Sequence, residues 1–237
     1  MHGIKVLARS LHMEACAERP ANAAEPDPTK SEQPIVFVVD DSADVREGVK
    51  QLVESVGLRC EVFTAPGEFL RRGPIAGPAC LILDVRLPEM NGLDLQVQLA
   101  RKIPTIMITG YGDIPMAVRA MQEGAVSFLT KPVREQELLD AIYAGLERHR
   151  ARLAQEAELK DLHARFETLS PREKEVMPLV VAGLLNKQIA AEVGLSEVTV
   201  KVHRHKMMLK LKAKSVPDLV RMAEALAIRN GDPRQRD

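Results

Sequence analysis

Five polar side chains with complementary chemistry each follow an apolar run in the first part of the chain. They are three aspartates, a threonine and a lysine: Asp40, Asp41, Asp84, Thr109 and Lys131. Carboxylate oxygens are the ligands that Mg²⁺ prefers, and waters fill its remaining positions. A carboxylate can also attack a phosphoryl group, while a metal ion and an ammonium offset the charge on the phosphoryl oxygens. These residue types therefore suit an aspartate that is phosphorylated beside a divalent cation.

The five side chains suggest separate roles in such a site. Asp40 and Asp41 would hold Mg²⁺ (or Mn²⁺), and Asp84 would be both a metal ligand and the nucleophile. Lys131 would offset charge, and Thr109 would donate a hydrogen bond to a phosphoryl oxygen. Adjacent carboxylates repel and raise each other's pKa, so we expect a cation to neutralise Asp40 and Asp41. Any one of these residues alone would be an ordinary polar residue at a strand end.

The apolar runs before these residues predict the element that brings them together. Strand-like runs lie at 35–39, 59–63, 80–83, 105–108 and 125–130, and helical periodicity lies at 45–56, 92–99, 116–123 and 138–146. Alternation of this kind from Pro34 to about Arg150 predicts five βα units in a doubly wound parallel sheet. The carboxyl ends of all its strands would open on one side, which is where ligands bind in such folds.

The C-terminal part of the chain has clear signals for where helices begin and end. Ser170-Pro171-Arg172-Glu173 has the form of a capping box, with proline at the first helical position. Gly194 separates a short helix at 186–193 from a basic helix that Ser196 can cap. A helix, a glycine turn and a basic second helix form the helix-turn-helix layout, which reads the major groove of DNA.

The two sides of the basic helix differ in polarity. The side expected to be buried carries Val200, His203, Met207 and Leu211, which would make His203 a packed core histidine. The opposite side carries the predicted base contacts Lys201, Val202 and His205. The predicted phosphate contacts are Asn186, Lys187, Thr199 and Arg204. The alternative is a solvated basic helix face, which is common in proteins.

Composition and charge agree with two different domains. Residues 165–237 contain 14 Lys and Arg against 9 Asp and Glu, whereas residues 1–164 contain 19 against 24. A basic C-terminal part suits a polyanion as its partner. No apolar run approaches the roughly 20 residues of a membrane-spanning helix, and Lys5 and Arg9 interrupt the apolar start of the chain. The 3 cysteines form no Cys-x-x-Cys pair, so we expect a cytoplasmic protein.

The remaining segments are expected to connect or extend the domains. Residues 1–33 are rich in alanine, glutamate and proline, which predicts a disordered extension. Residues 151–165 are predicted to be a helical linker, either a long helix that continues the helix at 138–146 or an exposed, partly helical segment. Residues 231–237 are expected to be a flexible tail.

The stretch from Pro34 to Arg150 resembles the receiver domain of two-component response regulators, and its FixJ branch in particular. The resemblance depends on Asp40-Asp41, Asp84 before Leu87-Pro88-x-Met90-x-Gly92, Thr109-Gly110 and Lys131-Pro132. It implies a flavodoxin-like fold of five parallel strands in the order 2-1-3-4-5, and phosphotransfer from a sensor histidine kinase to Asp84. It also implies that the backbone carbonyl of Arg86 is a metal ligand, that Thr109 and Phe128 form a switch pair, and that a cis bond joins Lys131 to Pro132.

Residues 166–228 resemble the LuxR/NarL/FixJ-type DNA-binding domain. The motifs are Leu169-Ser170-Pro171-Arg172-Glu173, Gly183-x-x-Asn186-Lys187 and Thr199-Val200-Lys201-x-His203-Arg204. The resemblance implies an all-α domain of four helices, within residues 166–230, whose third helix reads the major groove. His205 stands where members of this family often have lysine, and Pro178 stands inside the first helix in place of the usual apolar residue.

These expectations combine into a phosphorylation-controlled transcriptional regulator. Its expected partners are a sensor histidine kinase, promoter DNA, RNA polymerase and a second copy of the chain, with no membrane. We expect no enzymatic activity beyond the receiver's own phosphotransfer and dephosphorylation. One alternative is an aspartyl-phosphate phosphohydrolase, although such enzymes usually need a second acid two residues after the nucleophile, where this chain has Arg86. The other is a regulator that works without phosphorylation.

Overall fold

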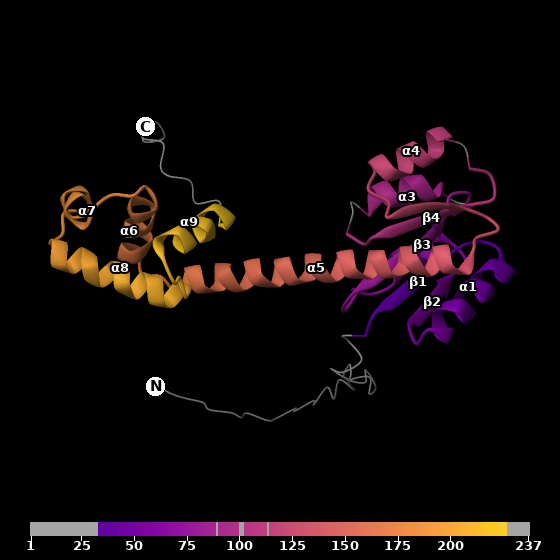
Figure 1. Ribbon diagram of the computed structural model, residues 1–237, viewed down its shortest axis with the longest axis horizontal. Helices are drawn as coiled ribbons and strands as arrows, with labels where there is room; N and C mark the ends of the chain where they lie inside the picture. Colours follow the sequence, from indigo (N-terminus) through magenta and orange to yellow (C-terminus); the bar gives the residue numbers. More distant parts are fainter. Residues whose placement is uncertain (1–32, 89, 100–101, 113, 227–237) are drawn as a thin grey trace, which may run out of the picture.

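The computed structural model describes residues 33–88, 90–99, 102–112 and 114–226 of the 237-residue chain (Figure 1). The predictions for residues 1–32 and 231–237 lie outside these ranges. The described strands are β1 (Ile35–Val39), β2 (Arg59–Phe63), β3 (Ala79–Asp84), β4 (Thr105–Thr109) and β5 (Ser127–Thr130). The helices of the first half are α1 (Ala43–Ser55), α2 (Pro66–Arg71), α3 (Gly92–Gln98), α4 (Ile114–Gln122) and the long α5 (Glu135–Glu167). The second half contains α6 (Pro171–Val181), α7 (Asn186–Val193), α8 (Glu197–Leu211) and α9 (Val216–Ala225).

The strands form one parallel sheet in the order β2-β1-β3-β4-β5, which confirms the predicted fold and strand order. Every residue of β1, β3 and β4 is buried. Strands covered on both faces contain continuous apolar runs instead of an alternating pattern, which is why these runs could be recognised in the sequence. The short helix α2 was not predicted.

Helices cover the two faces of the sheet in different groups (Figure 1). On one face Phe37 packs in a cluster with Phe69 of α2, Leu93 of α3 and Ala120 of α4. On the other face Val36 and Val38 pack with residues of α1 and α5, including Val53, Leu138 and Ile142. The alternation of β1 side chains between the two clusters follows from the period of two along a strand.

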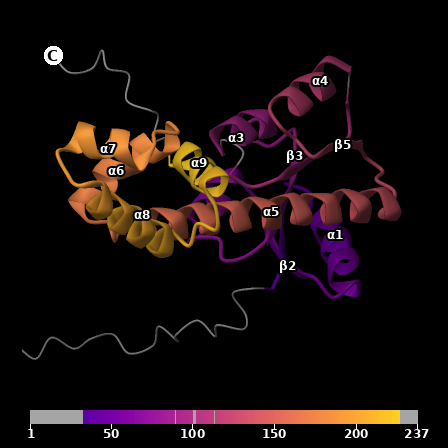
Figure 2. The same cartoon turned by 60° about the vertical axis from the view of Figure 1, so that its left-hand side comes forward.

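Helix α5 is continuous over 33 residues, which is the first of the two alternatives for the linker. Its first turns lie on the sheet, and its last turns contribute Leu162 and Phe166 to the core of the helical domain (Figures 1 and 2). Residues 154–161 between these ends are exposed. Ion pairs at i,i+4 spacing, Arg152 with Glu156 and Arg165 with Asp161, accompany the exposed stretch.

The helices α6 to α9 form an all-α domain with its own hydrophobic core. The predicted capping box is present, because the Ser170 side chain accepts from the Glu173 N–H and the Glu173 carboxylate accepts from the Ser170 N–H. Gly194 ends α7 in the left-handed conformation, with φ at 67°. Ser196 caps α8 as predicted, accepting from the Thr199 N–H.

One prediction for α8 needs correction. Val200, Met207 and Leu211 are fully buried, as expected from their spacing. His203 is only half-buried, although its Nδ1 atom is shielded from solvent and has no hydrogen-bond partner among the described residues. His203 therefore lies at the margin of the core. The buried side of α8 covers a narrower arc of the helix than the apolar spacing predicted, and it contains Val200, Met207 and Leu211. Within the described ranges no helix is both long enough and apolar enough to span a membrane.

Candidate functional site

Three carboxylates gather at the carboxyl edge of the sheet. Asp40 directly follows β1 and Asp84 ends β3, and these neighbouring strands pair in register with Val39 beside Leu83. Asp40 is fully buried, Asp84 is 6% exposed and Asp41 is exposed. One carboxylate oxygen from each lies within 4.8 Å of the others. The sheet topology thus brings together the three aspartates predicted to meet.

Lys131 lies between two of these carboxylates. Its Nζ atom donates to Asp40 Oδ2 and to Asp84 Oδ2, each at 2.6 Å. Its backbone N–H donates to the Thr109 carbonyl at 2.8 Å, and the bond to Pro132 is cis, as the resemblance implied. Burial by itself would lower the pKa of Lys131, but the hydrogen bonds to Asp40 and Asp84 outweigh it and raise the pKa. The ammonium is therefore held protonated.

The pKa of Asp40 is raised for a different reason from the one expected. Burial of the carboxylate is the largest cause, and hydrogen bonds from Lys131 and the Ser42 N–H oppose it. The nearby negative charge that adds to the rise belongs to Asp84, and Asp41 makes no such contribution. Since Asp41 is exposed, its charge is solvated, whereas Asp40 and Asp84 share one buried space.

Backbone N–H groups hold the other oxygen of each buried carboxylate. Ser42 N–H donates to Asp40 Oδ1 at 2.9 Å, and Arg86 N–H donates to Asp84 Oδ1 at 3.0 Å. Both side chains are therefore fixed between a backbone donor and the Lys131 ammonium. The turn after Asp84 needs glycine at position 92, because a Cβ there would lie 2.1 Å from the Asp84 carbonyl oxygen. Sequence reasoning used Gly92 as part of a motif but missed this close approach.

Thr109 ends β4, and Phe128 lies near it on the neighbouring strand β5. The buried Thr109 hydroxyl is bonded to the backbone of Tyr111, accepting from its N–H at 3.3 Å, and makes no bond to Asp84. Phe128 is partly buried against the core on one face of the sheet. A Cβ at Gly112 would lie 2.9 Å from Phe128 Cε1 and 3.2 Å from Thr109 Cγ2. Gly112 thus lies against both side chains, a contact that no sequence pattern indicated.

The donor set of this site suits a hard divalent cation. All three clustered side chains offer carboxylate oxygens, which Mg²⁺ and Ca²⁺ prefer over nitrogen or sulfur ligands. Asp41 is exposed, so it can approach a cation at the mouth of the site. The residues present therefore fit a divalent cation beside Asp84.

The predicted DNA-binding residues lie on and beside α8, in two structural groups. Lys201, Val202 and His205 are exposed on the helix, and Lys187 is exposed on α7. Asn186, Thr199 and Arg204 instead form bonds within the domain. Arg204 donates to Asn186 Oδ1 at 3.0 Å, and the Thr199 hydroxyl lies 2.8 Å from Ser196 Oγ. The bond between Arg204 and Asn186 ties the start of α7 to α8, whereas the contact between Thr199 and Ser196 lies at the start of α8 itself.

Comparisons with known proteins match both parts of the chain. Residues 36–143 match the response regulator receiver domain, and residues 167–223 match the luxR family of bacterial regulatory proteins. Nodulation protein W of Bradyrhizobium diazoefficiens is 52% identical, over 84% of this chain and 88% of that protein. Response regulator protein TodT of Pseudomonas putida is 47% identical, over 81% of this chain and 86% of that protein.

Two further relatives also match most of the chain. Transcriptional regulatory protein FixJ of Rhizobium meliloti is 42% identical, over 80% of this chain and 95% of that protein. A low-resolution structure of the response regulator StyR is 47% identical and superimposes with a TM-score of 0.72, over 81% of this chain and 98% of that one. The chain therefore belongs to the family of two-component transcriptional response regulators that join a receiver domain to a LuxR-type DNA-binding domain.

Proposed function

We propose that Asp84 accepts a phosphoryl group from a sensor histidine kinase, and that this phosphorylation controls the binding of α8 to promoter DNA. The observation that carries the proposal is the Lys131 ammonium, which is hydrogen-bonded at 2.6 Å to both Asp84 and Asp40. A protonated lysine beside a reactive carboxylate is placed to stabilise charge that develops on a transferred phosphoryl group.

The residues of the site divide the work of phosphotransfer. One carboxylate oxygen of Asp84 attacks the phosphorus of a phosphorylated kinase histidine; the new O–P bond forms as the P–N bond breaks, and the imidazole leaves with the bonding pair. The Arg86 N–H keeps the Asp84 carboxylate in one orientation through its bond to Oδ1. The Lys131 ammonium, which donates to the Asp84 carboxylate before transfer, then donates to a phosphoryl oxygen. The Thr109 hydroxyl leaves the Tyr111 backbone and donates to another phosphoryl oxygen.

We further propose that Mg²⁺ (or Mn²⁺) is the resident cation. Asp40, Asp41 and Asp84 would hold it, together with the backbone carbonyl of Arg86. When bound, the cation would offset the negative charge of the carboxylates and of the phosphoryl oxygens. The same charge argument explains why the cation and Lys131 belong to one site: two nearby carboxylates and an incoming phosphoryl group carry more negative charge than a single ammonium offsets.

The output of the site would reach DNA through α5 and the switch pair. Thr109 and Phe128 are proposed to move together, since Gly112 lies against both. A change on that side of the receiver would favour a homodimer, and two DNA-binding domains in one dimer bind neighbouring half-sites more tightly than separate domains do. Contact with RNA polymerase would follow on the promoter. These steps, and the cytoplasmic location, are parts of the proposal.

The boundaries of the parts are also proposed from the sequence. The receiver would comprise residues 34–150, the linker 151–165 and the DNA-binding domain 166–230. Helix α5 runs through both inner boundaries without a break, and its Leu162, within the proposed linker, already packs in the core of the helical domain.

The contacts proposed for DNA follow from exposure. Lys201, Val202 and His205 would contact base edges. Lys187 would contact phosphates directly, while Asn186, Thr199 and Arg204 would do so while remaining bonded within the domain. The lysine at 201 can donate to guanine, and the valine can contact a thymine methyl group.

The proposal is tested by DNA binding before and after phosphorylation. A binding sequence is first selected from a random DNA library with the protein, and affinity is then measured with and without a small phosphodonor and Mg²⁺. We expect the phosphodonor to tighten binding by wild type and to leave the Asp84→Asn variant unchanged. Equal affinities for treated and untreated wild type would favour the alternative of a regulator that works without phosphorylation.

A further inference from the structure

An apolar stripe runs along the exposed side of α8. Val198 is 74% exposed, Val202 45% and Leu209 64%, and none of the three belongs to the core of the helical domain. Figure 1 shows α8 along one side of that domain, with α6 and α7 on the other side of the helix. The exposed stripe therefore faces away from the rest of the domain.

Val198 has the same helical spacing as the residues proposed to contact bases. Lys201, Val202 and His205 follow it after three, four and seven residues. Residues at i, i+3, i+4 and i+7 share one side of a helix. Val198 also lies in the first turn of α8, which begins at Glu197. Since the N-terminal residues of such a helix contact base edges in helix-turn-helix proteins, Val198 is placed to reach DNA with the other three.

Helix stability gives no reason for a valine at this position. Branching at Cβ restricts the side chain in a helix, and the first turn favours acidic residues. The cap is made by Ser196, whose hydroxyl accepts from the Thr199 N–H, and Val198 takes no part in it. One exposed valine is ordinary in a protein. Three exposed apolar side chains on one side of one helix indicate an apolar contact there.

Basic side chains accompany the exposed stripe. Lys201 lies on the same side of α8, and Lys206 follows Val202 by four residues; both lysines are exposed. Neither forms a hydrogen bond or an ion pair with another described residue. The major groove of DNA offers phosphates along its edges and thymine methyl groups on its floor, so it matches both kinds of side chain. An apolar protein surface would leave the two ammonium groups without partners.

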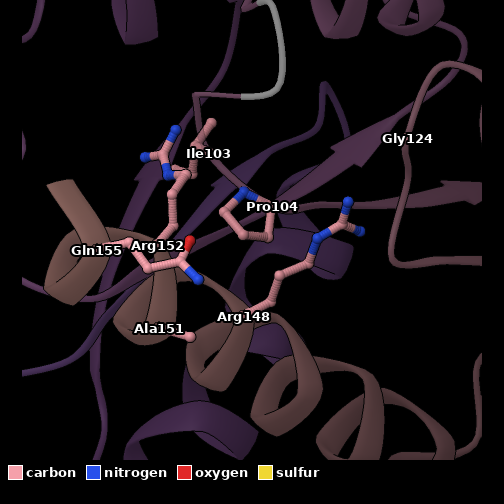
Figure 3. Close-up of a pocket in the computed structure, with 7 residues that line it drawn as sticks. All are labelled: Ile103, Pro104, Gly124, Arg148, Ala151, Arg152 and Gln155. Atoms are coloured by element: carbon pink, nitrogen blue, oxygen red, sulfur yellow. The ribbon is translucent and has the colours of Figure 1, made fainter. Parts of the chain in front are cut away.

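A second group of basic side chains, in a hollow between α5 and the start of β4, lacks this combination. Figure 3 shows Arg148 and Arg152 on either side of Pro104 in that hollow. Arg152 donates to the Lys102 carbonyl, which holds its side chain against the receiver. The apolar residues beside the arginines, Ile103 and Pro104, are buried. Exposed apolar and basic side chains thus occur together on α8 and not in this hollow.

We propose that Val198 contacts the C5-methyl group of a thymine in the major groove and so helps to determine the sequence that the protein binds. This inference rests on the proposed function, because it requires α8 to bind promoter DNA. Thymine presents a methyl group at the groove edge, whereas cytosine and adenine present amino groups and guanine presents two acceptors. A valine against those polar edges would leave them without hydrogen-bond partners. Val198 would therefore specify thymine at one position.

The test removes thymine methyl groups one at a time. A binding sequence is selected from a random DNA library with the phosphorylated full chain. Each thymine in that sequence is then replaced in turn by uracil, which lacks only the methyl group. Fluorescence anisotropy gives the affinity of wild type, Val198→Ala and Leu209→Ala for every duplex. Leu209→Ala is the matched control, since Leu209 is similarly exposed on the same side of α8 but lies in its last turn.

We expect one thymine whose replacement by uracil weakens wild-type binding by about fourfold, the effect of losing one methyl-sized apolar contact. The same replacement should leave Val198→Ala unaffected and should weaken Leu209→Ala as much as wild type. If Val198→Ala and wild type respond alike at every thymine, this contact is overturned, while phosphorylation-controlled DNA binding stands. If the phosphorylated protein selects no sequence at all, the proposed function fails and this contact fails with it.

Discussion

The ion pair between Lys210 and Glu173 should determine how firmly α8 is held in the DNA-binding domain. Lys210 Nζ donates to Glu173 Oε2 at 2.6 Å and also to the Thr168 carbonyl at 3.0 Å. The Glu173 side chain is only 3% exposed, and its carboxylate also accepts from the Ser170 N–H of the capping box. One carboxylate therefore joins the start of α6 to the last turn of α8.

We predict that Lys210→Met destabilises α8 by about 2 kcal/mol. Removing one partner of a buried pair costs roughly 3–5 kcal/mol, because the other charge stays buried and unpaired. Lys210 itself is 37% exposed, so water screens part of the interaction and the expected cost is lower. The matched control is Arg172→Met. Arg172 lies 2.7 Å from Glu175, nearly the same distance, but that carboxylate is 45% exposed, so the control should cost at most about 0.5 kcal/mol.

Hydrogen exchange of α8 peptides in the full chain, read by mass spectrometry, measures this difference. A loss of about 2 kcal/mol speeds exchange through local opening by roughly 30-fold, and a loss of about 0.5 kcal/mol speeds it by roughly twofold. Similar exchange rates in the two variants would refute the reasoning, since it attributes the cost to burial of the carboxylate and not to the distance between the charges.

The pair should also give α8 a characteristic pH dependence. Burial alone would raise the pKa of Glu173, but hydrogen bonds from Lys210 and the Ser170 N–H outweigh it and lower the pKa. A lowered folded-state pKa contributes stability above the unfolded value of about 4.3, and this stability is lost as pH falls through the folded value. The difference between wild type and Lys210→Met should therefore be largest near neutral pH and shrink in acid. A difference that grows on acidification would contradict the assignment.

Three further predictions concern the receiver and DNA. Gly92→Ala should slow phosphorylation sharply, because its Cβ would lie 2.1 Å from the Asp84 carbonyl oxygen, while Gly48→Ala, with open space around its Cβ, should leave the rate unchanged. Chelation of divalent cations should abolish phosphorylation by a small phosphodonor, and added Mg²⁺ should restore it; undiminished labelling would exclude a cation role. Lys201→Ala should weaken DNA binding by about 1–3 kcal/mol and relax specificity at one base pair, whereas Lys160→Ala on the linker should do neither. Binding is compared by fluorescence anisotropy, and equal losses in the two lysine variants would count against the proposed base contact.

The strand ends of the receiver could be located from the sequence because the sheet is covered on both faces. Such strands are unbroken apolar runs, so the first polar residue after each run marks its end. Asp40, Asp84 and Thr109 were placed in this way, and the resemblance supplied the strand order. Helix α2 was missed because its six residues, Pro66–Arg71, make fewer than two turns and show no helical period.

Contacts between distant parts of the chain were beyond sequence reasoning. The position of Lys131 between two carboxylates depends on three strands that meet at one edge of the sheet. His149 gave no signal in the sequence, because its burial depends on a hydrogen bond to Ala79, 70 residues earlier. The length of α5 stayed open because residues 154–161 pack against nothing that would create an apolar period.

Intact mass after incubation with a small phosphodonor and Mg²⁺ tests the central claim most directly. Wild type should gain the mass of one phosphoryl group, and Asp84→Asn should gain none. Asp41→Asn is the informative comparison, since Asp41 belongs to the same cluster but is proposed only as a metal ligand; it should be labelled slowly, and on Asp84 when the site is mapped. A phosphoryl group on the Asp84→Asn protein, or none on folded wild type even with a phosphorylated histidine kinase domain as donor, would contradict the account.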